Sequence, residues 1–144
     1  MKVDVVGRWD IVTFEQAYDD GRRVLPFGEH IEGFVRYVED GDMIVFIARK
    51  ERAHFVQGGQ WNAPDVEKAA AYNSVLSYAG RWTLDGDVVT HHVDFSVFPN
   101  WVGGVQKRKV RVLENGDIAL EARLEADTSE ARTARLVWRR RPTK

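Results

Sequence analysis

Cysteine is absent from the 144-residue chain, so neither a disulfide scaffold nor a thiolate-ligated metal site can form. An excess of one charge sign is also absent, because 21 Lys and Arg residues nearly balance 22 Asp and Glu residues. No strong electrostatic field would draw the chain to nucleic acid or to anionic lipid. We therefore expect a cytoplasmic protein with neither nucleic acid nor membrane as a partner.

Long apolar runs are missing as well. Residues 1–10 hold no apolar stretch long enough for a signal peptide, and no later segment is long enough to span a membrane. The chain also lacks a Gly-rich phosphate loop and a Gly-x-Ser-x-Gly nucleophile elbow. Its length fits one domain, 1–144, with a core of its own. Five Trp, seven Phe and four Tyr residues could serve that core or line an apolar pocket.

Short segments of alternating apolar and polar residues predict strands, because successive side chains of a strand face opposite sides. Tight turns separate these segments, for example Glu39–Asp42 and Asp85–Asp87. The predicted strands cover residues 7–15, 22–27, 33–38, 43–49, 81–84, 88–98, 105–113, 117–125 and 133–140. Eight to ten short antiparallel strands favour a mainly β fold, a single closed β-barrel.

One helix is predicted in the middle of the chain. Asn62 can cap it, Pro64 suits its first turn, and apolar residues at helical spacing continue to Ala79, with Gly80 at its end. A single helix cannot bury its own apolar face. We expect this helix to plug a barrel mouth or to lie on the outer wall.

Two paired strands are predicted on either side of an aromatic loop at residues 99–104. This pairing sets Phe95 opposite Arg108 and His91 opposite Val112. The other side of the ladder is charged and is expected to face water, with the pairs Ser96–Lys107, Asp94–Lys109 and His92–Arg111.

The next turn, Glu114–Gly116, fits a three-residue hairpin loop that sets Val110 opposite Leu120. Both turns predict the same inner face of the barrel. Three polar side chains lie on that face among apolar ones, namely His91, Gln106 and Arg108.

The neighbouring residues His91 and His92 point to opposite faces of their strand, so they cannot chelate one metal ion, and we expect no metal. A catalytic triad of His92, Asp94 and Ser96 is also disfavoured. Residues two apart on a strand are separated by about 6.6 Å along its axis, and these three lie on the face expected to meet water.

The polar inner residues each have two interpretations. His91 is either a general acid or base, or a core histidine bonded to a backbone carbonyl or to Tyr37. Arg108, with Gln106 beside it, either holds an anionic or carbonyl ligand or forms an internal ion pair with Glu15. A position near the rim would instead let Arg108 reach water.

The loop at residues 98–104 suits a lid or portal at a barrel mouth, because loops on rigid barrels often carry function. Asn100 and Trp101 would contact a ligand there. Alternatively, Trp101 packs against the helix cap or a neighbouring subunit. The apolar walls of a cavity would come from aromatic residues, namely Tyr37, Tyr78, Trp82 and Phe95.

Several short motifs give the chain a family resemblance. They are Gly7-x-Trp9, Pro26-Phe27-Gly28, Gly33-x-x-x-Tyr37, Asp40-Gly41-x-Met43, Gly80-x-Trp82, Thr90-His91-His92-Val93, Pro99-Asn100-Trp101-Val102-Gly103 and Leu136-Val137-Trp138. In these motifs the chain resembles the bacterial lipocalin-like domain family over nearly its whole length. The resemblance implies a calycin-type barrel around a small-molecule cavity. The chain departs from true lipocalins in lacking disulfides and in placing its helix mid-chain.

Three hypotheses about function follow. In the first, the barrel binds a small, largely apolar ligand that carries a polar or anionic group. In the second, the same cavity works as a cofactor-independent isomerase, cyclase or lyase, with His91 as general acid/base and Arg108 stabilising negative charge. In the third, the barrel is packed solid, and the apolar outer face of residues 43–49 forms a homodimer surface.

Overall fold

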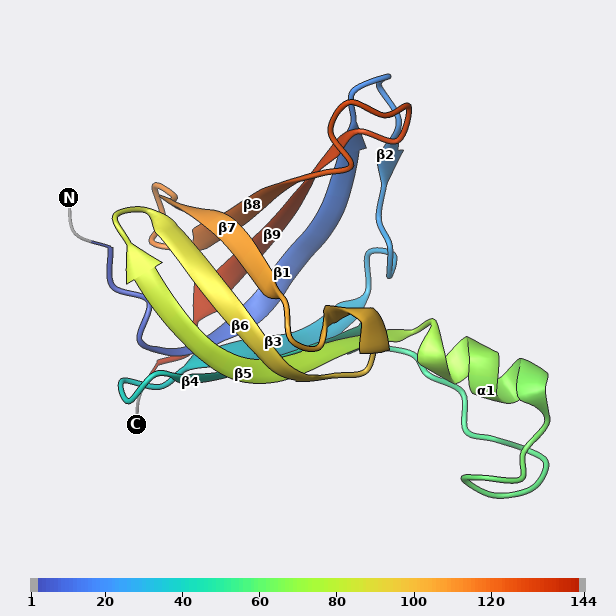
Figure 1. Cartoon of the computed structure of the whole chain (residues 1–144). Helices are drawn as coiled ribbons and strands as arrows, with labels where there is room; N and C mark the ends of the chain where they lie inside the picture. Colours follow the sequence, from blue (N-terminus) through green and yellow to red (C-terminus); the bar gives the residue numbers. More distant parts are fainter. Residues whose placement is uncertain (1–2, 143–144) are drawn as a thin grey trace.

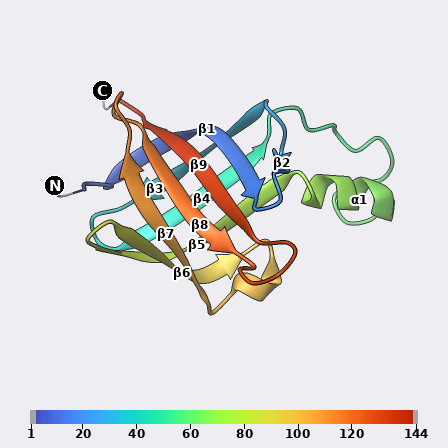
Figure 2. The same cartoon turned by 90° about the horizontal axis from the view of Figure 1, so that it is seen from above.

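The alternating segments form nine strands in the computed structural model, which describes residues 3–142. The strands are β1 (Gly7–Tyr18), β2 (Arg23–Val24), β3 (Ile31–Tyr37), β4 (Asp42–Arg49), β5 (Val75–Asp85), β6 (Val88–Ser96), β7 (Val105–Val112), β8 (Ile118–Leu124) and β9 (Arg132–Arg140). β1 pairs with both β3 and β9, which closes eight antiparallel strands into an up-and-down barrel (Figures 1 and 2). The short β2 pairs with the end of β1. The predicted fold class is confirmed.

The hairpin β7–β8 has the predicted register. The Leu113 N–H donates to the carbonyl of Asp117 over 2.8 Å, and Val110 lies opposite Leu120. The strand–turn–strand unit of β3 and β4 is also confirmed, with Val35 opposite Val45. A short turn fixes the pairing of its flanking strands, which explains why both hairpins could be predicted.

The predicted register between β6 and β7 is wrong by six residues. His91 lies opposite Gln106 instead of Val112, and Arg108 lies opposite Val89 instead of Phe95. The reason is that the last residues of β6 leave β7 and pair only with β5. Because six is an even number, the shift keeps the side chains of the paired residues, including His91, Gln106 and Arg108, on their predicted face.

The predicted charged pairs on the outer side of this ladder are therefore also wrong. Asp94 lies 3.7 Å from Arg81 of β5, and Lys109 lies 3.7 Å from Asp87. The residues actually opposite one another are Thr90 and Lys107, Val88 and Lys109, and His92 and Val105.

A β-bulge in β6 moves Phe95 to the outside of the barrel. Asp94 is the extra residue of the bulge. Val93 pairs with Gly80, and Phe95 pairs with the preceding residue of β5, Ala79. Phe95 is consequently 73% exposed, and its predicted place in the cavity wall is wrong. The bulge requires close approach of the two backbones: a Cβ atom on Gly80 would lie 1.8 Å from the His92 carbonyl oxygen.

A second bulge, at Val12 of β1, has the same effect on Glu15. Phe14 and Gln16 point inward after it, and Glu15 points outward, where it forms an ion pair with Arg23. The predicted internal pair of Glu15 with Arg108 is therefore wrong. One inserted residue reverses the alternation of every position that follows it in the strand.

The helix α1 (Asp65–Tyr72) is much shorter than predicted. Asn62 does not cap it and instead accepts a hydrogen bond from the Gly59 N–H over 2.6 Å. The second half of the predicted helix is β5, because Leu76, Tyr78, Trp82 and Leu84 repeat with the period of a strand.

Nor does α1 plug the mouth or cover the wall. It has no buried residue and projects away from the barrel (Figure 1). Within residues 3–142, no helix has the length and apolar character needed to cross a membrane.

The two ends of the barrel differ in how they are filled. At one end, Trp9, Tyr37 and Val89 belong to the buried core, and Val5 from the segment before β1 joins them. At the other end, formed by the end of β1 and the start of β5, the interior is hollow. The barrel interior therefore holds a cavity at that end.

Candidate functional site

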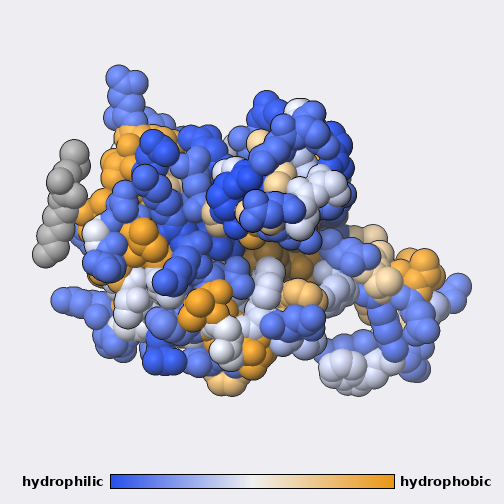
Figure 3. Space-filling view, turned by 45° about the horizontal axis from the view of Figure 1, so that its top comes forward, coloured by the Kyte–Doolittle hydropathy of each residue, from blue (hydrophilic) through white to orange (hydrophobic). Residues whose placement is uncertain are grey.

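The hollow end of the barrel contains a cavity of about 330 Å³. This volume lies at the small end of the range typical of ligand pockets. Most of its lining is apolar, including Phe14, Leu76, Leu120 and Leu136. Apolar surface in a hollow, bordered by hydrophilic residues, is visible in Figure 3. The cavity shows that the interior is not packed solid.

His91 projects from β6 into this cavity and is only 3% exposed. Both of its ring nitrogens are bonded: the Tyr37 hydroxyl lies 2.6 Å from Nε2, and the Tyr78 hydroxyl lies 2.6 Å from Nδ1. Burial, assisted by the positive charge of Arg108, lowers the pKa of His91 to about 3. The imidazole is therefore neutral at physiological pH.

The two tyrosines stay protonated for the same reason. Burial raises the pKa of Tyr78 to about 12 and the pKa of Tyr37 well above its usual value, although the charge of Arg108 opposes both changes. Tyr78 lines the cavity, whereas Tyr37 lies behind His91. The bond to Tyr37 confirms one of the predicted interpretations of His91.

Trp82 does not line the cavity. Its ring packs against Tyr37 with 5.2 Å between ring centroids, and its indole N–H donates to the Val38 carbonyl over 2.8 Å. Trp82 therefore supports Tyr37 from the filled end of the barrel.

Arg108 and Gln106 both line the cavity, as predicted. The Nη2 group of Arg108 donates to Gln106 Oε1, and its Nη1 group donates to the Lys107 carbonyl, each over 3.0 Å. Arg108 forms no ion pair with a carboxylate among residues 3–142. The two neutral oxygen atoms use only some of the five N–H donors of Arg108. The others are available to a ligand in the cavity.

The aromatic loop closes one side of the cavity mouth. Trp101 lines the cavity and packs edge-on against Tyr78 and Phe98, with centroid distances of 5.7 and 5.2 Å. Asn100 lies in the 3-10 turn Pro99–Trp101, is exposed, and does not line the cavity.

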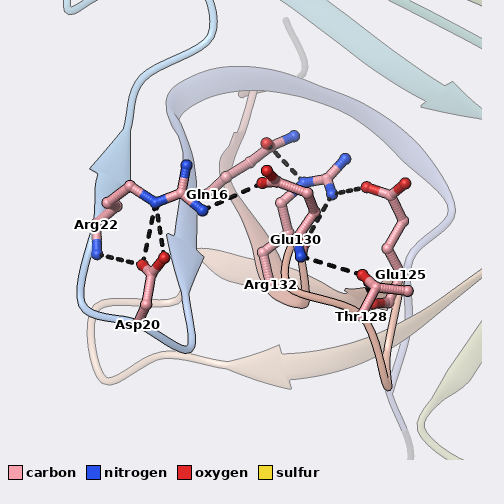
Figure 4. Close-up of polar contacts among 7 residues, drawn as sticks. All are labelled: Gln16, Asp20, Arg22, Glu125, Thr128, Glu130 and Arg132. Atoms are coloured by element: carbon pink, nitrogen blue, oxygen red, sulfur yellow. Dashed lines mark hydrogen bonds and ion pairs between the residues drawn. The ribbon is translucent and has the colours of Figure 1, made fainter.

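A polar network on the opposite side of the mouth was not predicted (Figure 4). Arg132 Nε donates to Gln16 Oε1 over 2.9 Å, and Arg132 also forms an ion pair with Glu125. Nearby, Arg22 Nη2 lies 3.1 Å from Glu130 Oε2. These contacts connect the β1–β2 loop to the β8–β9 loop. The bulge in β1 hid Gln16 from sequence reasoning.

An eight-stranded barrel around an apolar cavity with a few inward polar groups is the architecture of a lipocalin-type ligand-binding protein. The profile of the family described as "Lipocalin-like domain" matches residues 6–141. The chain belongs to this family, and the resemblance inferred from the sequence motifs is confirmed.

The proteins to which the chain is similar include a curated carrier protein and a protein of solved structure. The 4'-hydroxy-3'-methoxypropiophenone carrier protein ppsC of Aspergillus oryzae (strain ATCC 42149 / RIB 40) is 37% identical over 62 residues, which cover 38% of this chain and 54% of that protein. The match thus spans about half the length of the relative. A solved structure of an uncharacterized protein from Bacteroides eggerthii DSM 20697 aligns with a TM-score of 0.45 and 16% identity, covering 96% of this chain and 100% of the other.

Proposed function

We propose that the chain is a small-molecule carrier that holds a largely apolar ligand with a hydrogen-bond acceptor inside its barrel. The observation that supports this proposal most is the cavity of about 330 Å³, lined by apolar side chains and by donor groups of Tyr78 and Arg108. Apolar walls favour burial of an aromatic or aliphatic body, and few polar groups then determine its orientation.

The similarity to a carrier protein supports the same proposal. The compound in the name of that carrier, 4'-hydroxy-3'-methoxypropiophenone, combines an aromatic ring with a carbonyl, a methoxy and a hydroxyl group. A molecule of this kind has the apolar body and the acceptor atoms that the cavity suits. It is therefore the first ligand to test on this chain.

Binding is favoured over turnover by the state of His91. Both ring nitrogens are occupied by tyrosine hydroxyls, and an imidazole with a pKa of about 3 is a weak base at neutral pH. The enzyme alternative, with His91 as general acid/base and Arg108 as anion stabiliser, stays a prediction. So do the absence of a cofactor and a homodimer formed through the outer face of β4, where Ile44 is exposed.

A fluorescence titration tests the carrier proposal. Trp101 and Trp138 both line the cavity, so added 4'-hydroxy-3'-methoxypropiophenone should change tryptophan emission in a saturable way. Ala134→Leu fills cavity space and should weaken binding at least about tenfold, whereas Ala17→Leu, at an exposed position of β1, should leave it unchanged.

Thermal melting would establish that both variants are folded. A flat titration with this ketone and with related aromatic ketones would contradict the proposal. Equal affinity in wild type and Ala134→Leu would show that a ligand binds elsewhere.

A further inference from the structure

Three buried rings lie in series between the filled end of the barrel and the cavity. Tyr37 of β3 contacts His91 of β6 through Nε2, and Tyr78 of β5 contacts it through Nδ1, each over 2.6 Å. A neutral imidazole carries one N–H group and one acceptor nitrogen. One tyrosine must therefore donate to His91 and the other must accept from it.

The surroundings of the two hydroxyls decide the direction. Tyr37 is 1% exposed, does not line the cavity, and has no hydrogen-bond partner besides His91 among the described residues. If Tyr37 accepted from Nε2–H, its own hydrogen would be buried without an acceptor, which folded proteins rarely allow. Tyr78 lines the cavity, where a ligand can accept its hydrogen.

We propose that Tyr37 donates to Nε2, that Nδ1–H donates to the Tyr78 oxygen, and that the Tyr78 hydroxyl hydrogen is thereby directed into the cavity to bind a ligand carbonyl. Tyr78 is then the specificity-determining donor, and Tyr37 and His91 are positioning residues. This inference rests on the proposed carrier function and specifies its ligand class as neutral molecules with a carbonyl group.

Other polar groups at the cavity favour the same class. The indole N–H of Trp138 is buried and has no hydrogen-bond partner within residues 3–142, and Trp138, which is 1% exposed, lines the cavity. Arg108 contributes further donors, while the Oε1 acceptor of Gln106 is already used by Arg108. The other acceptor side chains of the lining, Gln16 and Glu125, are bonded to Arg132. The cavity thus presents mainly donors, and a ligand has to supply the acceptor.

A neutral carbonyl suits the site better than a carboxylate. The pKa of Tyr78 is raised despite the charge of Arg108, so burial outweighs that charge at the inner part of the cavity. An anion placed beside Tyr78 would meet the same desolvation penalty. Arg132, the second arginine of the lining, is already paired with Glu125 and does not offset that penalty. A carbonyl oxygen accepts from Tyr78 without introducing a charge.

The test compares two ligands that differ only at the carbonyl: 4'-hydroxy-3'-methoxypropiophenone and 2-methoxy-4-propylphenol, in which a methylene group replaces the carbonyl. Wild type should bind the ketone at least about tenfold more tightly, since an unpaired buried donor disfavours the methylene compound. Tyr78→Phe should bring the affinity ratio close to one. Tyr37→Phe should reduce the ratio even though Tyr37 does not line the cavity.

Tyr72→Phe is the matched control, because it removes a phenol hydroxyl from an exposed tyrosine of α1 that does not line the cavity, and it should keep the ketone preference. Nitrogen-15 NMR of His91 should show a protonated Nδ1 and an unprotonated Nε2 in wild type, and Tyr37→Phe should disturb this pattern. A merely structural role of Tyr37 would leave the tautomer unchanged.

Distinct results would overturn the inference and the carrier proposal. Equal binding of the two ligands by wild type, or a protonated Nε2, refutes the directed donor and leaves the carrier proposal standing. Tighter binding of 4-hydroxy-3-methoxybenzoate than of the ketone refutes the neutral ligand class. Binding of none of these compounds refutes the carrier function, and the inference falls with it.

Discussion

Acidification should destabilise the protein through His91. The pKa of this imidazole is about 3 in the folded chain, against an ordinary value of 6.5. Below pH 6.5 the unfolded chain therefore binds a proton that the folded chain does not accept, and stability falls as the pH falls. The loss ends only when the pH passes below the folded pKa of about 3.

The magnitude follows from that difference. At about 1.4 kcal/mol for each pH unit, and less near the two pKa values themselves, moving from pH 6.5 to pH 5 should remove about 2 kcal/mol of unfolding free energy, and moving to pH 3 should remove about 4 kcal/mol. Carboxyl groups with lowered pKa values, those of Asp19, Asp20 and Asp117, start from 3.8 and contribute mainly below pH 4.5. The window between pH 6.5 and 4.5 therefore isolates His91.

Urea unfolding at pH 7, 6 and 5 would measure the effect in wild type and in His91→Gln. Glutamine keeps a donor and an acceptor but does not titrate in this range. The variant should be less stable at pH 7 and should show a much flatter dependence on pH. Equal slopes in the two proteins, or wild-type stability that is unchanged from pH 7 to pH 5, would refute the burial and bonding assigned to His91.

Two further predictions test the bulge in β6. Phe95→Ser should change the unfolding free energy by no more than about 0.5 kcal/mol, because Phe95 is exposed, whereas Val93→Ala should lower it by about 2 kcal/mol. Urea unfolding measures both changes. A larger loss of stability in Phe95→Ser than in Val93→Ala would contradict the bulge. Gly80→Ala should lower the unfolding free energy by at least about 3 kcal/mol, because the added Cβ would collide with the His92 carbonyl oxygen. Gly104→Ala is the control and should be nearly neutral, because its Cβ would meet only an ordinary contact of 3.4 Å. A Gly80→Ala protein as stable as wild type would contradict the observed register.

The barrel and the inner polar face could be predicted because both depend on periodic patterns. Alternation indicated the strands, and short turns fixed the β7–β8 pairing. His91, Gln106 and Arg108 were placed on one inner face even though the β6–β7 register was wrong, because the shift was even. A pattern of period two is insensitive to such a shift.

Single inserted residues were the main limit on predicting the site. The bulges at Val12 and Asp94 reverse the alternation after them, so Glu15 and Phe95 were placed inside and Gln16 was missed. No residue type within β1 or β6 marks the insertion. The bulge in β1 is set by pairing with the distant strand β9, and the bulge in β6 by the close approach of its backbone to Gly80 of β5.

Tyr78 shows a different limit. Apolar residues at helical spacing extended the predicted helix to Ala79 and hid the strand to which Tyr78 belongs. The alternation of Leu76, Tyr78, Trp82 and Leu84 was the signal that could have revealed β5. Its bond to His91 joins the two strands of the β5–β6 hairpin, and it could not be placed while residues 75–79 were assigned to a helix.

The most direct test of ligand binding inside the barrel is a carbon-13 methyl NMR spectrum recorded during titration with 4'-hydroxy-3'-methoxypropiophenone. Methyl signals of the cavity residues Leu76, Leu120 and Leu136 should shift together and saturate, while those of Ile44 and Val97, which are exposed and do not line the cavity, should stay in place. Shifts at Ile44 and Val97 without shifts at the three leucines would contradict binding in the cavity.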